Sequence, residues 1–302
     1  MFGHRRRRCG CRSALAQMAV AAIMQVFCLA PAGAQERAQP PQHRAELEKQ
    51  EDIFRSQGDK VPGGYIVTRG LAKYAELLPS GFEAALRGLG ARDRWLDIGA
   101  GSGQAILDYY APEYVSLQNG VRPQRDRARA VGLSIEDRRT EAWMRRAIAL
   151  KAGQIQYLFG KRLRGYAPEE LGRFQLITDV YGGLSYTEEL SVFMQKVLDS
   201  LEANGDFYSL LQSVRLKDGK DNPKTTWYLT ELVDAADRDV KVCSWLESIP
   251  CVQVLCESKS DWETPTELIH IRKTCDAVAV PPLERLMYEA GNPPGRKFRL
   301  KP

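Results

Sequence analysis

The segment 94–105 restricts the fold of this chain more than any other part of the sequence. The apolar run Trp95-Leu96-Asp97-Ile98 carries a single acid, and glycine then recurs at alternate positions as Gly99, Gly101 and Gly103. Glycine adopts positive φ freely and lets the backbone approach a group where a side chain would collide. Helical spacing of apolar residues follows, and the start of a helix presents unpaired N–H groups. The segment therefore predicts a strand, a tight turn and a helix, with a ligand cradle made of main chain.

Strands alternate with helices along the rest of the sequence. Apolar periodicity predicts helices over 70–78, 82–89, 105–110, 140–151, 188–201 and 226–236. Continuous apolar or alternating runs predict further strands over 130–136, 155–159, 174–179, 206–211, 252–257 and 267–272. This alternation indicates an α/β fold with a doubly wound, mostly parallel sheet. The last two strands are joined by a loop too short for a crossover helix, so we expect them to run antiparallel at the sheet edge.

The spacing of the glycines separates two kinds of nucleotide-binding turn. Dinucleotide-binding turns usually read G-x-G-x-x-G, and the glycine pattern here does not fit that spacing. The run Asp97-x-Gly99-x-Gly101-x-Gly103 resembles the first motif of the class I S-adenosylmethionine-dependent methyltransferases. The resemblance covers roughly residues 71–273. It implies a Rossmann-like fold with a seven-stranded, mostly parallel sheet and an antiparallel last strand, and S-adenosyl-L-methionine as cofactor.

The resemblance also implies the cofactor-binding positions. Asp97 would lie beside the methionine portion, and the main chain of the turn would approach the cofactor through Gly99, Ala100, Gly101, Ser102 and Gly103. An acid at the end of the second strand normally accepts both ribose hydroxyls. Ser134 stands where that acid belongs, and we choose Glu136, which follows it; a plain surface carboxylate is the alternative interpretation.

A second motif follows the strand predicted over 174–179. The run Ile177-Thr178-Asp179-Val180-Tyr181-Gly182-Gly183 resembles the family's fourth motif, in which an acid or amide borders the reaction site. Asp179 and Tyr181 are therefore the catalytic candidates. The alternative is an aspartate that caps the turn before the two glycines. Methyl transfer from a sulfonium mainly requires alignment and exclusion of water, so a dedicated base is not needed.

The first 34 residues have the composition of a secretory signal peptide: basic residues, an apolar run and a small-residue site, Ala32-Gly33-Ala34. We predict export to the periplasm or the medium, with cleavage after Ala34. An uncleaved membrane anchor and a start codon assigned too far upstream are the alternatives. The predicted organisation continues with a linker and helix over 35–60, the methyltransferase-like domain over 61–280 and a C-terminal tail over 281–302.

Four cysteines follow the predicted signal: Cys243, Cys251, Cys256 and Cys275. An even number of clustered cysteines in an exported chain predicts two disulfides, and local pairing of Cys243 with Cys251 and of Cys256 with Cys275 is our expectation. Free buried thiols are the alternative. Closely spaced cysteine pairs are missing, so we predict no metal site.

The net charge of the chain limits the kinds of partner that we expect. The net charge is +5, and five arginines with no acid lie before Gln35, so the rest of the chain is neutral by count. We therefore predict no general nucleic-acid binding and, after cleavage, no stable membrane insertion. The sequence favours methyl transfer to an unidentified small-molecule or protein acceptor. The alternatives are an exported, non-catalytic nucleoside- or partner-binding protein and a nicotinamide-dependent oxidoreductase.

Overall fold

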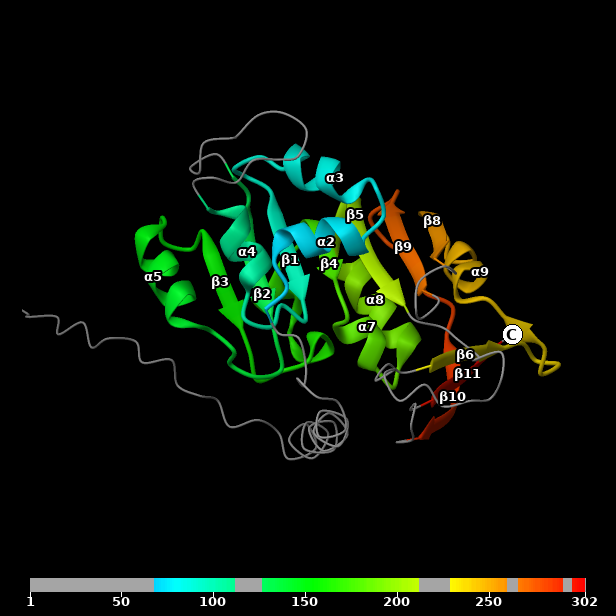
Figure 1. Cartoon of the computed structure of the whole chain (residues 1–302). Coiled ribbons are helices and arrows are strands. Elements are labelled where there is room, and N and C mark those ends of the chain that lie inside the picture. The colour runs from blue at the N-terminus through cyan, green and yellow to red at the C-terminus, as the bar shows by residue number, and fades with distance from the viewer. Residues whose placement is uncertain (1–67, 112–126, 212–228, 260–265, 290–294, 302) are drawn as a thin grey trace, which may run out of the picture. The chain divides into compact units, whose positions relative to one another are not determined.

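The computed structural model describes residues 68–111, 127–211, 229–259, 266–289 and 295–301, all of which belong to one compact unit (Figure 1). The predicted signal peptide, linker and first helix lie outside the described residues, as does the Pro62-Gly63-Gly64-Tyr65 segment. None of the helices in the described ranges combines the length and the apolar character needed to cross a bilayer.

The main sheet has seven strands in the order β3-β2-β1-β4-β5-β9-β8. The first five strands pair in parallel, whereas β9 runs antiparallel between β5 and β8. This is the arrangement that the resemblance to class I methyltransferases implies, so the predicted fold class and the antiparallel last strands are confirmed. The strands are β1 (Arg94–Ile98), β2 (Arg129–Leu133), β3 (Ile155–Leu158), β4 (Phe174–Asp179), β5 (Leu201–Leu211), β8 (Val252–Lys259) and β9 (Thr266–Lys273).

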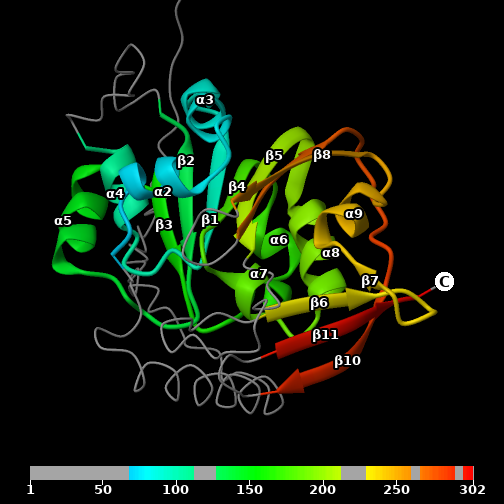
Figure 2. The same ribbon diagram turned by 45° about the vertical axis from the view of Figure 1, so that its right-hand side comes forward.

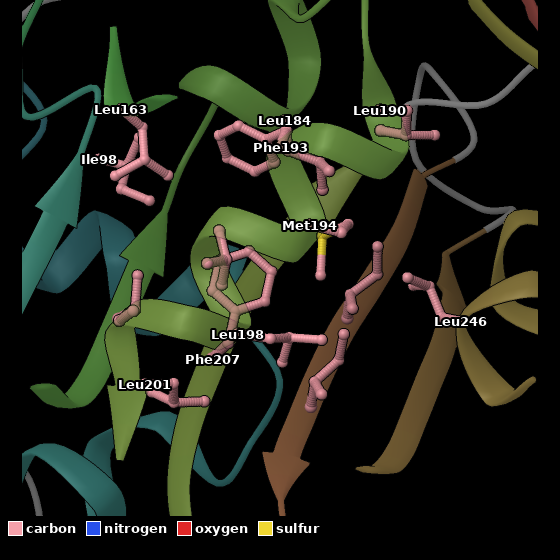
Figure 3. Packing of buried hydrophobic residues seen from close by; sticks show 14 of the residues in the cluster. Ile98, Leu163, Leu184, Leu190, Phe193, Met194, Leu198, Leu201, Phe207 and Leu246 are labelled. Atoms are coloured by element: carbon pink, nitrogen blue, oxygen red, sulfur yellow. The ribbon is translucent and has the colours of Figure 1, made fainter. Parts of the chain in front are cut away.

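Helices cover both faces of this sheet, because neighbouring residues of each central strand point to opposite sides. Trp95 enters the cluster that includes α2, α3 and α4, whereas Leu96 enters the cluster that includes α8 and α9. Figure 3 shows labelled side chains of α7 and α8 gathered against the strands that carry Ile98 and Phe207. The helical segments are α2 (Leu71–Leu77), α3 (Phe82–Gly88), α4 (Gln104–Tyr109), α5 (Glu141–Ala149), η2 (Leu163–Gly165), α6 (Pro168–Leu171), α7 (Gly183–Tyr186), α8 (Leu190–Ser200) and α9 (Val242–Glu247).

The end of α8 shows how the helices are tied to the sheet. The side chain of Lys273 is buried, and its Nζ donates to the carbonyl oxygens of Leu198 at 2.7 Å and Leu201 at 2.8 Å. The N–H of Leu201 also donates to the carbonyl of Leu198, so the ammonium group adds a second donor at the end of α8 and links it to the start of β5. Asn204, which the sequence predicts as the stop of this helix, lies within β5 and has φ of 64°, a left-handed conformation that asparagine adopts more readily than most residues.

A second, four-stranded sheet has the order β10-β11-β6-β7, with β6, β11 and β10 side by side in Figure 2. Its strands are β6 (Leu229–Val233), β7 (Asp239–Val240), β10 (Leu283–Glu289) and β11 (Gly295–Leu300). The helix predicted over 226–236 is therefore wrong in its described part. Parallel pairing with β11 overrides the local pattern, because a strand is defined by a partner that is distant in the sequence. The segment predicted as a tail over 281–302 contains two strands of this sheet.

Two disulfides are present, as predicted, but they join Cys243 to Cys256 and Cys251 to Cys275, so the predicted pairing is wrong. The antiparallel register of β8 and β9 explains the second bond, since Val252 lies opposite Lys273, the N–H of Thr274 donates to the carbonyl of Cys251, and Cys275 follows directly. The first bond joins α9 to the strand on which it packs. Two disulfides agree with an oxidising, exported location.

Candidate functional site

The predicted strand, turn and helix are all found at the carboxyl end of β1. Gly99, Gly101 and Gly103 all have positive φ, of 74°, 55° and 73°. The N–H groups of Gly99 and Ala100 donate to the carbonyl of Leu133 at the end of β2, at 2.8 and 3.0 Å. The turn is thereby held against the neighbouring strand, and we refer to residues 99–103 as the glycine turn.

Two of these glycines also face other parts of the protein at close range. A Cβ on Gly99 would lie 2.5 Å from the Cα of Gly182, and one on Gly103 would lie 2.3 Å from the ring of Trp143. The sequence predicts that the turn approaches a ligand, but at these two positions the close approach is to protein atoms. Internal packing therefore accounts for both glycines, whether or not a ligand also touches the turn.

Asp97 lies directly beneath the glycine turn and is fully buried. The hydroxyl of Tyr74, from α2, donates to both carboxylate oxygens at 3.1 and 3.0 Å, and Thr178 Oγ1 donates to one of them at 2.8 Å. Trp95 Nε1 in turn donates to Thr178 Oγ1. Burial raises the pKa of Asp97 to about 7, although the two hydroxyl donors oppose that shift. Asp97 thus joins α2, β1 and β4, and its contact with a ligand stays a prediction.

Asp179 ends β4 beside the glycine turn, since Ile98 and Asp179 are partners in the parallel pairing of β1 and β4. Its buried carboxylate accepts from the N–H groups of Gly182 at 2.8 Å and Leu184 at 2.9 Å. Burial raises its pKa to about 7, whereas those main-chain donors lower it. The carboxylate therefore caps the turn into α7, which is the alternative that the sequence left open, and its catalytic role stays a prediction.

Tyr181 follows Asp179 and has φ of 53°. Positive φ is rare for a bulky residue, and such strain often occurs at functional sites. The guanidinium carbon of Arg69 lies 4.6 Å from the centroid of the Tyr181 ring. Arg69 precedes α2 and was missed by the sequence analysis, because a lone arginine before a helix resembles any surface cation.

Glu136 lies after β2 on the surface, where its Oε2 is 2.5 Å from Nη2 of Arg138. This ion pair matches the alternative interpretation, and ribose binding by Glu136 stays a prediction.

Tyr157 of β3 connects this loop to the glycine turn. Its hydroxyl donates to the carbonyl of Gly101 at 2.5 Å, accepts from the N–H of Arg138 at 3.3 Å and hydrogen bonds to the side chain of Ser134. The sequence does not indicate this role of Tyr157, since an aromatic residue in a strand usually belongs to the core.

One side chain of the glycine turn has no protein partner within the part of the chain that the structure describes. The hydroxyl of Ser102 is buried and makes no hydrogen bond there. A buried hydroxyl without a partner requires an explanation, and a polar group of a bound ligand is one that fits the turn. The structure thus brings Asp97, the glycine turn, Asp179 and Tyr181 together at the ends of β1 and β4, and Glu136 lies beyond them at the end of β2.

No protein-family model matches the sequence, and no curated protein matches it. Solved structures are similar at low identity. An rRNA methylase from Streptococcus thermophilus is 10% identical, with a TM-score of 0.41, and covers 70% of this chain and 100% of its own. A 1,6-didemethyltoxoflavin-N1-methyltransferase from Burkholderia thailandensis, with bound S-adenosylhomocysteine, is 12% identical over 79% and 92%, with a TM-score of 0.45. Magnesium protoporphyrin IX methyltransferase from Synechocystis PCC 6803, also with S-adenosylhomocysteine, is 13% identical over 77% and 98%, with a TM-score of 0.43.

Proposed function

We propose that this protein binds S-adenosylmethionine and transfers its methyl group to an acceptor that is not identified. The observation that carries the proposal is the position of the glycine turn. It lies at the carboxyl end of β1, and the strand order reverses between β1 and β4. In open α/β sheets, ligands bind outside the carboxyl ends of the strands at this switch point.

The side chains around the turn suggest how the cofactor would be held. The main chain of the glycine turn and the Ser102 hydroxyl would contact it. Glu136 would accept hydrogen bonds from the ribose hydroxyls once its ion pair with Arg138 is broken. The bound cofactor supplies an activated methyl group. Asp179 keeps the start of α7 in place through two main-chain hydrogen bonds. Tyr181 would border the acceptor. Such a site works by alignment and exclusion of water.

Calorimetric titration with S-adenosylmethionine, S-adenosylhomocysteine and NAD tests the proposal. We expect the first two to bind and NAD not to bind. Glu136→Gln should weaken S-adenosylhomocysteine binding about tenfold, the loss of one charge-assisted hydrogen bond. Glu141→Gln, which breaks an exposed ion pair with Arg145, is the matched control and should leave the affinity unchanged. Binding of NAD alone would instead support the oxidoreductase alternative.

The second candidate is an exported, non-catalytic protein that uses the same edge of the sheet for another nucleoside-like ligand or a protein partner. Two observations favour it: Glu136 is paired with Arg138, and the Ser134 that replaces the expected acid is bonded to Tyr157. A folded protein that gives no heat with either adenosyl ligand would support this candidate.

We also propose that the protein is exported and cleaved after Ala34. The two disulfides support an oxidising compartment. Sequencing the first residue of the protein recovered from its host tests cleavage, and Gln35 is the expected result. Export would require a supply of the cofactor outside the cytoplasm, which makes this measurement relevant to the proposed activity as well.

A further inference from the structure

The second sheet reaches the proposed reaction site through one buried arginine. Arg296, from β11, is fully buried, and its Nη1 donates to the carbonyl oxygens of Leu184 at 2.7 Å and Thr187 at 3.0 Å. Its Nη2 donates to Thr230 Oγ1 of β6. The fork of the guanidinium group therefore links two strands of the second sheet to the beginning and end of α7.

Asp179 and Arg296 thus bind the same short segment, residues 182–187, one through its N–H groups and the other through its carbonyl oxygens. Asp179 accepts from the N–H groups of Gly182 and Leu184, and Arg296 donates to the carbonyls of Leu184 and Thr187. A helix of four residues satisfies few of its own main-chain groups, so its conformation depends on these external partners.

The held segment touches the glycine turn directly. A Cβ on Gly182 would lie 2.4 Å from the carbonyl oxygen of Ile98, and Gly182 packs against Gly99 through main-chain atoms. A displacement of residues 182–187 would therefore change the space beside the glycine turn. A second link supports the attachment, since Nη1 of Arg285, from β10, lies 2.7 Å from Oε2 of Glu188.

We propose that Arg296 is a positioning residue, which holds residues 182–187 against the glycine turn and makes the second sheet part of the ligand site. The inference rests on the proposed function, since it assumes that this edge of the main sheet binds the cofactor. Arg296 does not touch the ligand; it acts through α7 and Gly182.

Variants of the full chain test this, with S-adenosylhomocysteine as the probe. Arg296→Gln removes the charge and the fork, whereas Arg296→Lys keeps the charge. Arg299→Gln, on the same strand, breaks surface ion pairs with Asp237 and Glu284 and leaves Arg296 in place. Lys273→Met removes a buried cation whose hydrogen bonds go to Leu198 of α8 and Leu201 of β5, so it controls for general loss of stability.

We expect Arg296→Gln to accelerate amide hydrogen exchange at least tenfold in peptides that cover 182–187, and to weaken S-adenosylhomocysteine binding at least tenfold. Arg296→Lys should recover part of both effects, and Arg299→Gln should match the wild type. Lys273→Met should lower the midpoint of urea unfolding without changing the affinity. The inference is overturned if Arg296→Gln binds like the wild type, or if Lys273→Met accelerates exchange at 182–187 equally.

If the wild type does not bind S-adenosylhomocysteine, the proposed function fails, and hydrogen exchange alone decides whether Arg296 holds residues 182–187. If Arg296→Gln does not fold, Arg296→Lys decides by the same exchange measurement: faster exchange confined to 182–187 supports the positioning role, and unchanged exchange overturns it.

Discussion

Gly99 and Gly182 pack main chain against main chain, so that a Cβ on Gly99 would lie 2.5 Å from the Cα of Gly182. This contact joins the loops that follow β1 and β4 at the switch point of the main sheet. Contacts closer than 3.0 Å to a Cβ are essentially never seen, and backbone atoms cannot move aside as a flexible side chain can. The geometry of the proposed ligand site thus depends on two positions without side chains.

Gly99→Ala should destabilise the protein strongly. It introduces a methyl group where main-chain atoms already lie, and Gly99 has φ of 74°, which costs a residue with a Cβ about 1 to 2 kcal/mol. Together the two effects should lower the free energy of unfolding by about 3 kcal/mol or more. Urea unfolding followed by circular dichroism measures this change.

Gly153→Ala is the matched control for Gly99→Ala. Gly153 has nearly the same φ, 75°, but a Cβ there would have no atom within 4 Å. It should therefore show the cost of positive φ alone, about 1 to 2 kcal/mol. Equal losses in the two variants would contradict the main-chain contact between the two loops.

The pH dependence of stability should show the buried carboxylate of Asp97. Its pKa of about 7 lies above the ordinary 3.8, because burial disfavours the charged form. Between these values the folded protein binds the proton more tightly than the unfolded chain does. The stabilising contribution is fully present below pH 3.8 and is lost as the pH rises to about 7. Asp97→Asn should remove this fall, so its stability relative to the wild type should rise by a few kcal/mol between pH 4 and pH 7.

Asp137 supplies the control for the pH experiment. Its hydrogen bond with Arg139 lowers its pKa, and the group is exposed. Asp137→Asn should change the dependence of stability on pH only slightly and in the opposite sense. A carboxylate with a lowered pKa stabilises the folded state at pH values above its ordinary pKa, and an exposed ion pair contributes little. A parallel shift of the Asp97→Asn and wild-type curves would contradict a raised pKa for Asp97.

Each disulfide should contribute measurably to stability. Cys251 and Cys275 are 24 residues apart, and Cys243 and Cys256 are 13 apart. Closing loops of these lengths removes unfolded-state entropy worth about 3 kcal/mol each. Paired serine variants should therefore lower the urea midpoint by similar amounts, and reductant should have no further effect on a variant that lacks both. A non-reducing peptide map that shows any other pairing would contradict the structure.

The sequence predicted the architecture well, because the main sheet is built from strongly periodic segments. The apolar run of β4 and the spacing of Leu190, Phe193, Met194 and Val197 on α8 each indicate one type of element. The second sheet was not predicted, since β6 becomes a strand through pairing with β11, far along the chain. The disulfide pairing failed for the same reason: it depends on the register of β8 and β9, which cysteine spacing does not contain.

The candidate site was predicted in its position but not in its connections. The sequence indicated that the glycine turn and Asp179 lie at the same sheet edge, because both follow apolar strands. It did not indicate that the Tyr74 hydroxyl hydrogen bonds to both carboxylate oxygens of Asp97, nor that Arg296 donates to a main-chain carbonyl of α7. Such contacts join residues on separate elements, and each residue type is common in helices or strands that have no such role.

Tyr181 allows the strain at the site to be measured. Its φ of 53° is unfavourable for every residue with a Cβ and is easily adopted by glycine. In an ordinary loop or strand, alanine is the less destabilising replacement, because glycine loses more entropy on folding. Here the order should reverse. Tyr181→Gly should have a free energy of unfolding about 1 kcal/mol higher than that of Tyr181→Ala, and so a higher urea midpoint.

The same two variants separate strain from ligand contact. Both remove the ring and its contact with Arg69, so both should weaken binding of S-adenosylhomocysteine if the ring borders the ligand. If Tyr181→Ala binds S-adenosylhomocysteine more weakly and Tyr181→Gly does not, then the backbone conformation, rather than the ring, matters for binding. If alanine proves the more stable replacement, then Tyr181 is not held at positive φ, and the turn between β4 and α7 differs from the one described. That result would also remove the geometric basis for placing Tyr181 beside the acceptor.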